Sequence, residues 1–319
     1  MSTTELAASD RVIYEAVVSE VARVADAIVA VTFAADTDLP PWDPGAHIDL
    51  ELPNGKIRQY SLCGPHHRRR ELRIAVLREQ ASRGGSIAVH ELAVGTPVRI
   101  LAVRNYFPLG ESDEYVFIAG GIGIAPLMPM IEAVEARGIP WTLHYSGRSL
   151  SSMAYSTSLQ EAYPDRVMLY PSAHGRRIDL RAVLSSTAPG AGLYCCGPAR
   201  LMKEFEETCA LQGVEGHLER FAAAADTTAD LSEDRPFEVH LARTGITVMV
   251  EPGQTILEVA EAAGGDVFAS CEEGICGTCE TRVIEGDVDH RDSVLCGRDT
   301  GTMMICISRA LGSRLVIDA

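Results

Sequence analysis

The pattern of apolar and polar residues divides the chain into regions with different expected secondary structure. The first third carries about half a dozen short segments rich in β-branched residues, separated by turn signals such as Asn54-Gly55 and Gly84-Gly85. A helix-like insert stands around Ser86 to Leu92. Strands of this kind predict a small antiparallel barrel. The expected strands lie in VIYEAVVSEVARV, AIVAVTF, AHIDLEL, IRQYSL, LRIAVLR and TPVRILAVR.

From Glu114 onward, apolar strand-like segments alternate with helical ones. The expected strands are YVFIAG, PWTLHYSG, RVMLYPSA and GLYCCG. The expected helices are PLMPMIEAVEARG, MAYSTSLQEAYP, DLRAVLSS and ARLMKEFEETCALQG. This alternation predicts a parallel sheet with helices on both faces.

A small, acidic segment after Phe221, AAAADTTADLSEDR, is typical of a linker. From Pro236 the pattern predicts a hairpin in FEVHLARTGITVMV, a helix in TILEVAEAAG and then a loop with three cysteines. We therefore expect a multi-domain protein. Its parts are an antiparallel β-barrel domain at 1–112, an α/β parallel-sheet domain at 113–225, a linker at 226–235 and an α+β domain at 236–319.

Composition supports this division and excludes some functions. A chain of 319 residues is too long for one ordinary core. The 46% of hydrophobic residues indicates a globular protein. The net charge of −16 argues against nucleic-acid binding, which needs clustered Lys and Arg. An acidic surface could attract a basic protein partner, or simply keep the protein soluble.

The sequence also bears on location. Glu5, Asp10 and Arg11 interrupt the start of the chain where a signal peptide needs an apolar core. The longest apolar run, Val116 to Ile131, contains glycines and prolines and is too short to span a bilayer. We therefore expect a cytosolic protein without membrane contact. Disulfides are rare in that compartment, so the nine cysteines should have another purpose.

The first candidate motif is RQYSL, in an expected barrel strand. Because side chains alternate along a strand, Arg58 and Tyr60 share a face. A cation beside an aromatic plane suits a ligand with a phosphate and a flat ring. Taken alone, the pair is more often an ordinary barrel surface.

The second motif is AGGIGIAP, Ala119 to Pro126, at a junction of strand and helix. Glycines there allow the backbone to approach a pyrophosphate. The usual dinucleotide fingerprint would have a glycine in place of Pro126 and an acid after the next strand, but TLHYSGR has none. We therefore expect a nucleotide turn of another type; the alternative is a tight turn that needs small residues.

The third motif is the spacing C-x4-C-x2-C of Cys271, Cys276 and Cys279. A zinc ribbon would need a second close pair of cysteines, whereas Cys296 and Cys306 stand far apart. Three cysteines so spaced, followed by a distant fourth, are the plant-type pattern for a [2Fe–2S] cluster.

Six motifs in one order link the chain to a known family: RQYSL, SRGGS, AGGIGIAP, YCCGPARLM, HLERF and the cysteine loop. Over essentially its whole length the chain resembles the phthalate dioxygenase reductase family, which includes vanillate demethylase reductases. The resemblance implies a flavin barrel of the ferredoxin reductase type, an NADH-binding domain and a β-grasp ferredoxin-like [2Fe–2S] domain. NADH gives two electrons as hydride and the cluster accepts one at a time, so a flavin must stand between them.

The resemblance also assigns residues. Arg58 would bind the flavin phosphate, Tyr60 would stack on the ring and Ser61 would lie near N5. The implied catalytic residues are Ser61, Cys196 and Phe221. The implied flavin contacts are Arg58, Gln59, Tyr60, Ser61, Leu62, Ala75, Val76, Arg83, Gly84, Gly85 and Ser86. The implied nucleotide contacts are Gly120, Gly121, Ile122, Gly123, Cys196, Gly197 and Pro198.

The partner and the exact cofactors follow from the same resemblance. It implies a monomer that forms a transient complex with a Rieske-type oxygenase, because this sequence has no Rieske pattern of its own. We expect FMN, since SRGGSIAVH offers glycine amides, Arg83 and Ser86 to a terminal phosphate. We expect NADH on the family pattern, because Arg148 and the serines after it leave the sequence equivocal.

For the fourth cluster ligand we expect Cys306 rather than Cys296. MMICISRA indicates a strand from Met303 to Ser308, whereas DSVLCGRDTG is turn-like. The family pattern also has its fourth cysteine in the former segment, and usually a serine where Cys296 stands. Two other functions stay open: a free-standing NADH diaphorase for a small acceptor, and a flavin and cluster redox sensor with Cys296 as its sensing thiol.

Overall fold

The computed structural model describes residues 13–80, 82, 84–221, 234–295 and 301–319. The described residues up to Glu219 belong to one unit, and those from Arg220 onward belong to the other. No helix among the described residues is long and apolar enough to cross a membrane.

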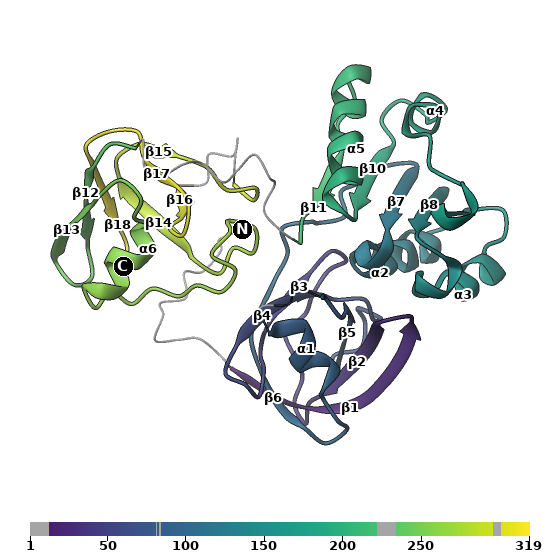
Figure 1. Cartoon of the computed structure of the whole chain (residues 1–319), viewed down its shortest axis with the longest axis horizontal. Helices are drawn as coiled ribbons and strands as arrows, with labels where there is room; N and C mark the ends of the chain where they lie inside the picture. The colour runs from purple at the N-terminus through teal and green to yellow at the C-terminus, as the bar shows by residue number, and fades with distance from the viewer. Residues whose placement is uncertain (1–12, 81, 83, 222–233, 296–300) are drawn as a thin grey trace. The chain divides into compact units, whose positions relative to one another are not determined.

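The first unit begins with a six-stranded antiparallel barrel. Its strands follow the order β4-β3-β6-β1-β2-β5, and a bridge between Leu62 and Ile74 joins the two ends of that order. Helix α1 (Gly85–His90) lies across the opening of the ring in Figure 1, with Val89 fully buried. The strands are β1 (Tyr14–Ala25), β2 (Ile28–Ala34), β3 (His47–Glu51), β4 (Ile57–Ser61), β5 (Glu71–Leu77) and β6 (Pro97–Arg104).

The second half of this unit is a five-stranded parallel sheet in the order β11-β10-β7-β8-β9. Its strands are β7 (Tyr115–Gly120), β8 (Trp141–Gly147), β9 (Val167–Pro171), β10 (Gly192–Cys196) and β11 (His217–Glu219). Its helices are α2 (Ile124–Ala136), α3 (Ser156–Ala162), α4 (Leu180–Ser185) and α5 (Ala199–Gln212). Short 3-10 turns stand at Gly121–Gly123, Leu150–Ser152 and Ser172–His174.

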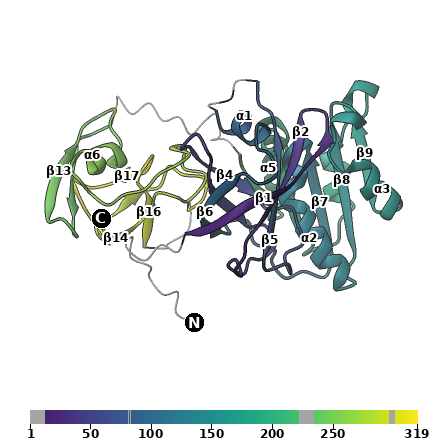
Figure 2. The same cartoon turned by 90° about the horizontal axis from the view of Figure 1, so that it is seen from below.

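Alternation along the central strand β7 explains the helices on both faces. Tyr115 and Phe117 belong to the core that includes residues of α2 and α3. Val116 and Ile118 belong to the core that includes residues of α4 and α5. Successive side chains of a strand point to opposite faces, so a continuous apolar strand needs helices on both sides. Figures 1 and 2 show these helices around the sheet.

The segment that joins barrel and sheet is held by tyrosine hydroxyls. Tyr115 Oη donates to the carbonyl of Gly110 at 2.6 Å, and the amide of Gly110 donates to Tyr194 Oη at 2.7 Å. Tyr194 Oη also donates to the carbonyl of Pro108 at 3.2 Å. Barrel residues such as Ile28 and Ala75 share one apolar core with the sheet. The two halves of this unit therefore form a continuous structure.

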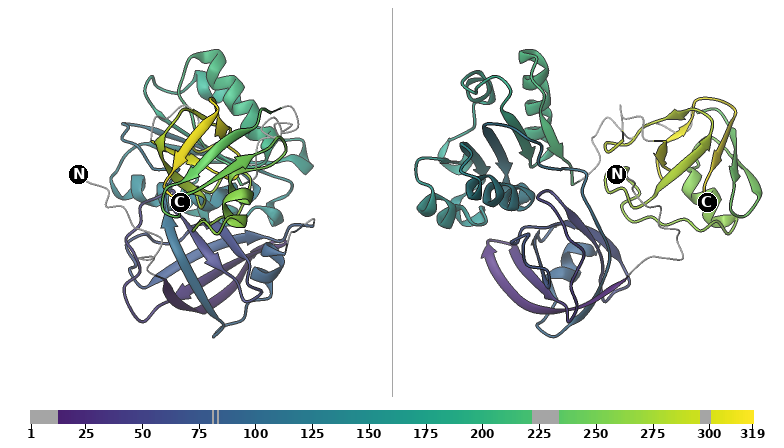
Figure 3. Two further views of the ribbon diagram at one scale, coloured as in Figure 1. Left: turned by 90° about the vertical axis from the view of Figure 1, so that its left-hand side faces the viewer. Right: turned by 180° about the vertical axis from the view of Figure 1, so that it is seen from behind.

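The second unit has a mixed five-stranded sheet in the order β13-β12-β18-β14-β16 and a small two-stranded sheet, β15-β17. Strands β12 and β18 pair in parallel and the other neighbours pair antiparallel. The unit is the green-to-yellow part of Figure 3. Its elements are β12 (Phe237–Leu241), β13 (Ile246–Val250), α6 (Ile256–Ala262), β14 (Glu280–Glu285), β15 (Val288–Asp289), β16 (Thr302–Met304), β17 (Arg309–Ala310) and β18 (Arg314–Ile317).

The three large sheets confirm the predicted fold class, while the predicted domain boundaries stay predictions. One expected strand is shorter than predicted. Strand β16 ends at Met304, and Cys306 lies in the turn that follows. The amides of Ile307 and Ser308 both donate to the carbonyl of Met304, at 3.2 and 2.9 Å, so the backbone turns where the apolar pattern suggested extension.

Candidate functional site

The RQYSL motif forms strand β4, and its side chains divide between two faces. Gln59 Nε2 donates to Asp49 Oδ1 at 2.9 Å, and Asp49 is also paired with Arg104. Arg58 and Tyr60 stand on the other face by the alternation of the strand. The side chain of Gln59 is therefore occupied away from the face that Arg58 and Tyr60 share.

The RQYSL and SRGGS motifs are neighbours in space. A Cβ on Gly85 would lie 2.8 Å from Cγ of Arg58, so only glycine leaves room for that side chain. Gly84 has a φ of 96°, and its carbonyl accepts from Asn54 Nδ2 at 3.4 Å. The side chain of Arg58 thus lies beside Gly85 at the start of α1. A guanidinium group and backbone amides at such a turn both bind phosphate well. Arg83 lies outside the described residues.

The hydroxyls and carbonyls around this loop have partners within the protein. Ser86 Oγ accepts from the amide of Glu79 at 3.1 Å and donates to Ser82 Oγ at 3.0 Å. His90 Nε2 contacts the carbonyl of Val76 at 2.9 Å. Three other predicted contact residues are buried: Leu62, Ala75 and Val76. Ser82 and His90 were not predicted, and they fix the loop that carries the predicted residues.

Ser61, at the end of β4, meets a carboxyl group that the sequence analysis did not assign. Its Oγ donates to Glu219 Oε2 at 2.9 Å. Glu219 ends β11 and pairs in register with Cys196 at the end of β10. Loss of hydration raises the pKa of Glu219 to about 8, and the Ser61 hydrogen bond opposes this shift. At neutral pH this carboxyl group therefore keeps its proton.

The thiol of Cys196 completes this group. Its side chain is fully buried, which raises its pKa well above the ordinary value, and the neighbouring Glu219 acts in the same direction. Cys196 is thus a neutral thiol. Phe221, the residue predicted from HLERF, belongs to the second unit and has 44% of its surface exposed. Glu219 could have been predicted as a site residue from the sequence, because it is an acidic residue in the same HLERF motif, at the end of a strand.

The glycines of the second motif have two different roles. A Cβ on Gly123 would lie 2.1 Å from the carbonyl oxygen of Cys196, and a Cβ on Gly197 would lie 2.9 Å from Cα of Gly120. These glycines allow the AGGIGIAP and C-G-P segments to touch each other. Gly121 differs, because it has a φ of 55° and no atom within 4 Å of its Cβ position.

Two neighbouring residues of this turn complete the contacts. Pro198 packs on Gly120, whose Cβ would lie 2.5 Å from its ring, and Ile122 packs on the core of the sheet. Tyr145 Oη, from β8, donates to the carbonyl of Gly121 at 3.0 Å. Ser146 Oγ donates to the carbonyl of Ala119 at 3.2 Å. The sequence analysis missed both hydroxyls, although a tyrosine and a serine in a buried strand were a usable signal.

The second unit brings four thiols together. Cys271 interacts with Cys276 and Cys306, and Cys306 also interacts with Cys279. All four are buried, with 4–8% of their surface exposed. The described cysteines are free of disulfides. Cys296 lies outside the described residues.

Backbone amides point at these sulfur atoms. The amide of Glu273 donates to Cys271 Sγ at 3.3 Å, and that of Thr278 donates to Cys276 Sγ at 3.5 Å. Hydrogen bonds from its neighbours hold the pKa of Cys271 well below the ordinary value. In the described segments, no three His, Cys, Asp or Glu side chains form a group that could hold a single metal ion. Four soft sulfur donors with amide donors fit an iron–sulfur cluster.

Residues 239–311 match the family of 2Fe-2S iron-sulfur cluster binding domains. The chain is 43% identical to phenoxybenzoate dioxygenase subunit beta of Ectopseudomonas oleovorans over 88% of each protein. It is 40% identical to vanillate O-demethylase oxidoreductase of Pseudomonas sp. (strain HR199 / DSM 7063), over 95% of this chain and 99% of that protein.

Solved structures agree. The fold matches an intact type IV self-sufficient cytochrome P450 monooxygenase with a TM-score of 0.90 and 41% identity, over 96% of this chain and 41% of that longer protein. It matches phthalate dioxygenase reductase, described as a modular structure for electron transfer from pyridine nucleotides to [2Fe-2S], with a TM-score of 0.69 and 32% identity, over 96% and 98%. A barrel, a parallel sheet and a cluster-binding domain in one chain define a modular iron–sulfur oxidoreductase. The chain belongs to the phthalate dioxygenase reductase family.

Proposed function

We propose that the chain is the reductase component of a multicomponent oxygenase or demethylase. It passes electrons from NADH, through FMN and a [2Fe–2S] cluster, to a Rieske-type oxygenase. The observation that carries this proposal is that one chain contains both the contact of Ser61 with Glu219 and the group of four thiols. The two relatives named above are a dioxygenase subunit and a demethylase oxidoreductase, which supports the class of partner.

Bound flavin supplies the ability to accept an electron pair and to release single electrons. Arg58 and the amides of Gly84 and Gly85 bind its terminal phosphate, and Tyr60 covers its ring. Arg58 lies beside Gly85, so both can bind one phosphate, and the family resemblance makes FMN the expected flavin. Flavin released by heat and identified by chromatography as FAD would contradict this assignment.

Ser61 and Glu219 hold a proton at the flavin site. Because the pKa of Glu219 is raised to about 8, its carboxyl group is uncharged at neutral pH, and its Oε2 accepts a hydrogen bond from Ser61 Oγ at 2.9 Å. Cys196 stays neutral and excludes water from the same corner. The role that the family resemblance implies for Phe221 stays a prediction, because Phe221 belongs to the other unit.

The nucleotide lies over the glycine turn. Gly121 offers an open backbone position, and Tyr145 and Ser146 hold the carbonyls of Gly121 and Ala119 from behind. The turn is thus fixed before the nucleotide arrives, which lowers the entropic cost of binding. Gly120, Ile122, Gly123 and the Cys196–Pro198 segment complete the nicotinamide side.

The cluster ligands are Cys271, Cys276, Cys279 and Cys306. The oxygenase docks as a transient partner of a monomeric reductase, because an electron-transfer complex must release its partner after each electron.

Anaerobic addition of NADH tests the function directly. NADH should bleach the flavin band first and then reduce the cluster, and the protein should support turnover of a purified Rieske oxygenase. A haem oxygenase in parallel tests the partner class, since one structural match is a cytochrome P450. Physiological activity that survives deletion of residues 236–319 would favour the diaphorase, and negligible reduction of cytochrome c with NADH would favour the redox sensor.

A further inference from the structure

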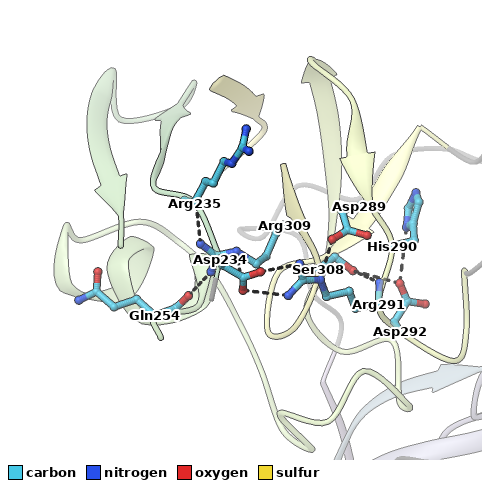
Figure 4. A network of polar contacts seen from close by, with 9 residues as sticks. All are labelled: Asp234, Arg235, Gln254, Asp289, His290, Arg291, Asp292, Ser308 and Arg309. Atoms are coloured by element: carbon cyan, nitrogen blue, oxygen red, sulfur yellow. Dashed lines mark hydrogen bonds and ion pairs between the residues drawn. The ribbon is translucent and has the colours of Figure 1, made fainter. Parts of the chain in front are cut away.

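One carboxylate stands where the chain enters the iron–sulfur unit. Asp234 lies three residues before β12 and is largely buried. Its two oxygens accept from both terminal nitrogens of Arg291 at 2.8 and 2.9 Å, and Oδ2 is also 3.1 Å from Nε of Arg309. Figure 4 shows the carboxylate between the two guanidinium groups.

The two arginines have further contacts that fix their positions. Arg309 is nearly fully buried, donates to the carbonyls of Gln254 at 2.6 Å and Arg235 at 3.2 Å, and stacks on the ring of Phe237. Arg291 Nε donates to Asp289 Oδ2 at 2.7 Å. Such a pairing of a planar guanidinium with carboxylates is directional, so it fixes orientation as well as charge.

Both arginines neighbour residues that hold the cluster side of the unit. Arg309 follows Ser308, whose Oγ donates to Asp292 Oδ2 at 3.2 Å and accepts from the amide of Arg291 at 3.3 Å. Ser308 stands two residues after Cys306. The loop around Asp292 is thus hydrogen-bonded to the segment that carries Cys306.

The same loop touches the segment that carries the other three thiols. Asp292 Oδ1 accepts from the amides of Val294 and Leu295, which closes the loop. The amide of Ser293 donates to the carbonyl of Gly274 at 3.0 Å, between Cys271 and Cys276. A continuous set of contacts therefore runs from Asp234 to both cysteine segments.

We infer that Asp234 is a positioning residue for the cluster: it fixes Arg291 and Arg309, and through them the segments of Gly274 and Cys306. Without its carboxylate the two guanidinium groups repel each other, and the loop from Asp289 to Leu295 loses its anchor. The inference rests on the proposed cluster. It means that the segment around Asp234, just before β12, helps to hold the cluster ligands in place.

The test compares Asp234→Asn with Asp318→Asn in the full cluster-loaded protein. Asp318 is a matched control, because it also binds one arginine with both oxygens, Arg243 at 2.8 and 3.1 Å, in the same unit. Asp234→Asn should release the cluster to a chelator about 10-fold faster, the effect usual for a lost outer contact of a metal site. It should also change the electron paramagnetic resonance spectrum of the reduced cluster, while flavin reduction by NADH stays unchanged.

Asp318→Asn should keep the wild-type release rate and spectrum, and Asp234→Glu should restore both. Equal release rates and spectra for the two asparagine variants would overturn the inference. If Asp234→Asn does not fold, Arg291→Lys replaces it, with faster release expected and an unchanged rate and spectrum counting against the inference. The release comparison needs no turnover, so a wild-type cluster that NADH cannot reduce would refute the proposed function and leave this test standing.

Discussion

The two chemical groups of this chain differ in what they can hold. Ser61, Glu219 and Cys196 combine hydroxyl, protonated carboxyl and neutral thiol, so this group is uncharged at neutral pH. The four thiols meet amide donors, which stabilise negative charge on sulfur without supplying a mobile proton. Hydride transfer brings its own hydrogen and leaves one added negative charge on the flavin, which uncharged neighbours do not oppose, whereas the cluster takes up a single electron. Each group therefore suits a different step of one electron path.

The groups also differ in how they are assembled. Ser61, Cys196 and Glu219 end three strands of two different sheets, so their meeting depends on the packing of the barrel on the parallel sheet. Three of the four thiols stand in one loop of nine residues. The group of Ser61, Cys196 and Glu219, here called the hydride side, should therefore respond to distant changes in packing. The group of four thiols, here called the cluster side, should respond mainly to changes within its own loops.

The largest expected effect is the loss of one thiol. Cys306→Ser should remove the visible bands of the cluster and abolish cytochrome c reduction, because the fourth soft ligand is missing. NADH should still reduce the flavin, since the hydride side lies in the other unit. Absorbance spectra and stopped-flow reduction measure both outcomes.

Cys296→Ser is the control for this prediction and should keep the cluster, the flavin and cytochrome c reduction. The opposite pattern in the two variants would show that the ligand assignment is wrong. A swapped ligand in the Cys306 variant would appear as a partly restored, altered spectrum.

The next effect concerns the proton. Glu219→Gln keeps an oxygen to accept from Ser61 and stays uncharged at every pH, so flavin reduction by NADH should keep its wild-type rate at pH 7. In the wild type the rate should fall as the pH rises through about 8, where Glu219 ionises. The variant should lose this dependence. The exposed Glu215→Gln is the control, and an unchanged pH profile in Glu219→Gln would rule out the role.

The same carboxyl group affects stability with a definite sign. Its pKa is raised from 4.5 in the unfolded chain to about 8 in the folded one, so between these values the folded state binds the extra proton. This contribution to the free energy of unfolding is complete below pH 4.5 and is lost as the pH rises toward 8. Urea denaturation across this window should show the free energy of unfolding of the wild type falling relative to that of Glu219→Gln as the pH rises.

The glycines give a smaller effect that tests the assembly of the hydride side. A methyl group on Gly123 would collide with the backbone of Cys196, so Gly123→Ala should lower the free energy of unfolding by about 3 kcal/mol. Gly121→Ala meets open space and carries only the cost of its φ of 55°, roughly 1 kcal/mol. Gly123→Ala should also raise KM for NADH more than Gly121→Ala. Equal values for both variants would contradict the packing role.

The sequence predicted the features that depend on local order. Alternating apolar residues in YVFIAG and the breaks at Gly84-Gly85 were enough for the strands and the sheets, because burial and turn geometry act over a few residues. The three cysteines of the loop were visible for the same reason.

The features that the sequence hid depend on distant contacts. Glu219 gains its partner Ser61 across 158 positions of the chain, and no local pattern shows such a pairing. The strand expected from Met303 to Ser308 ends at Met304, because the hydrogen bonds of the turn compete with the apolar pattern. The close contacts of Gly123 with the backbone of Cys196, and of Gly197 with that of Gly120, join segments that are distant in the sequence, so no local pattern shows them.

The smallest expected effect tests whether the four thiols and their hydrogen-bond donors affect only the charge of the cluster and hold no mobile proton. Thr278 Oγ1 lies 3.1 Å from Cys276 Sγ, and when Cys276 is a thiolate this hydroxyl is the donor and stabilises negative charge on the sulfur. Thr278→Val keeps the shape and removes the hydroxyl, so the reduced, more negative cluster loses more stabilisation than the oxidised one. A net hydrogen bond of about 0.5–1.5 kcal/mol corresponds to a fall in midpoint potential on the order of 20–60 mV for one electron. Redox titration followed by electron paramagnetic resonance should detect this fall, with Thr278→Ser close to wild type. Suppose instead that the midpoint potential of the variant equals that of the wild type at pH 7 but changes with pH. A proton would then move with the electron at the cluster, and the contrast between the two groups would fail.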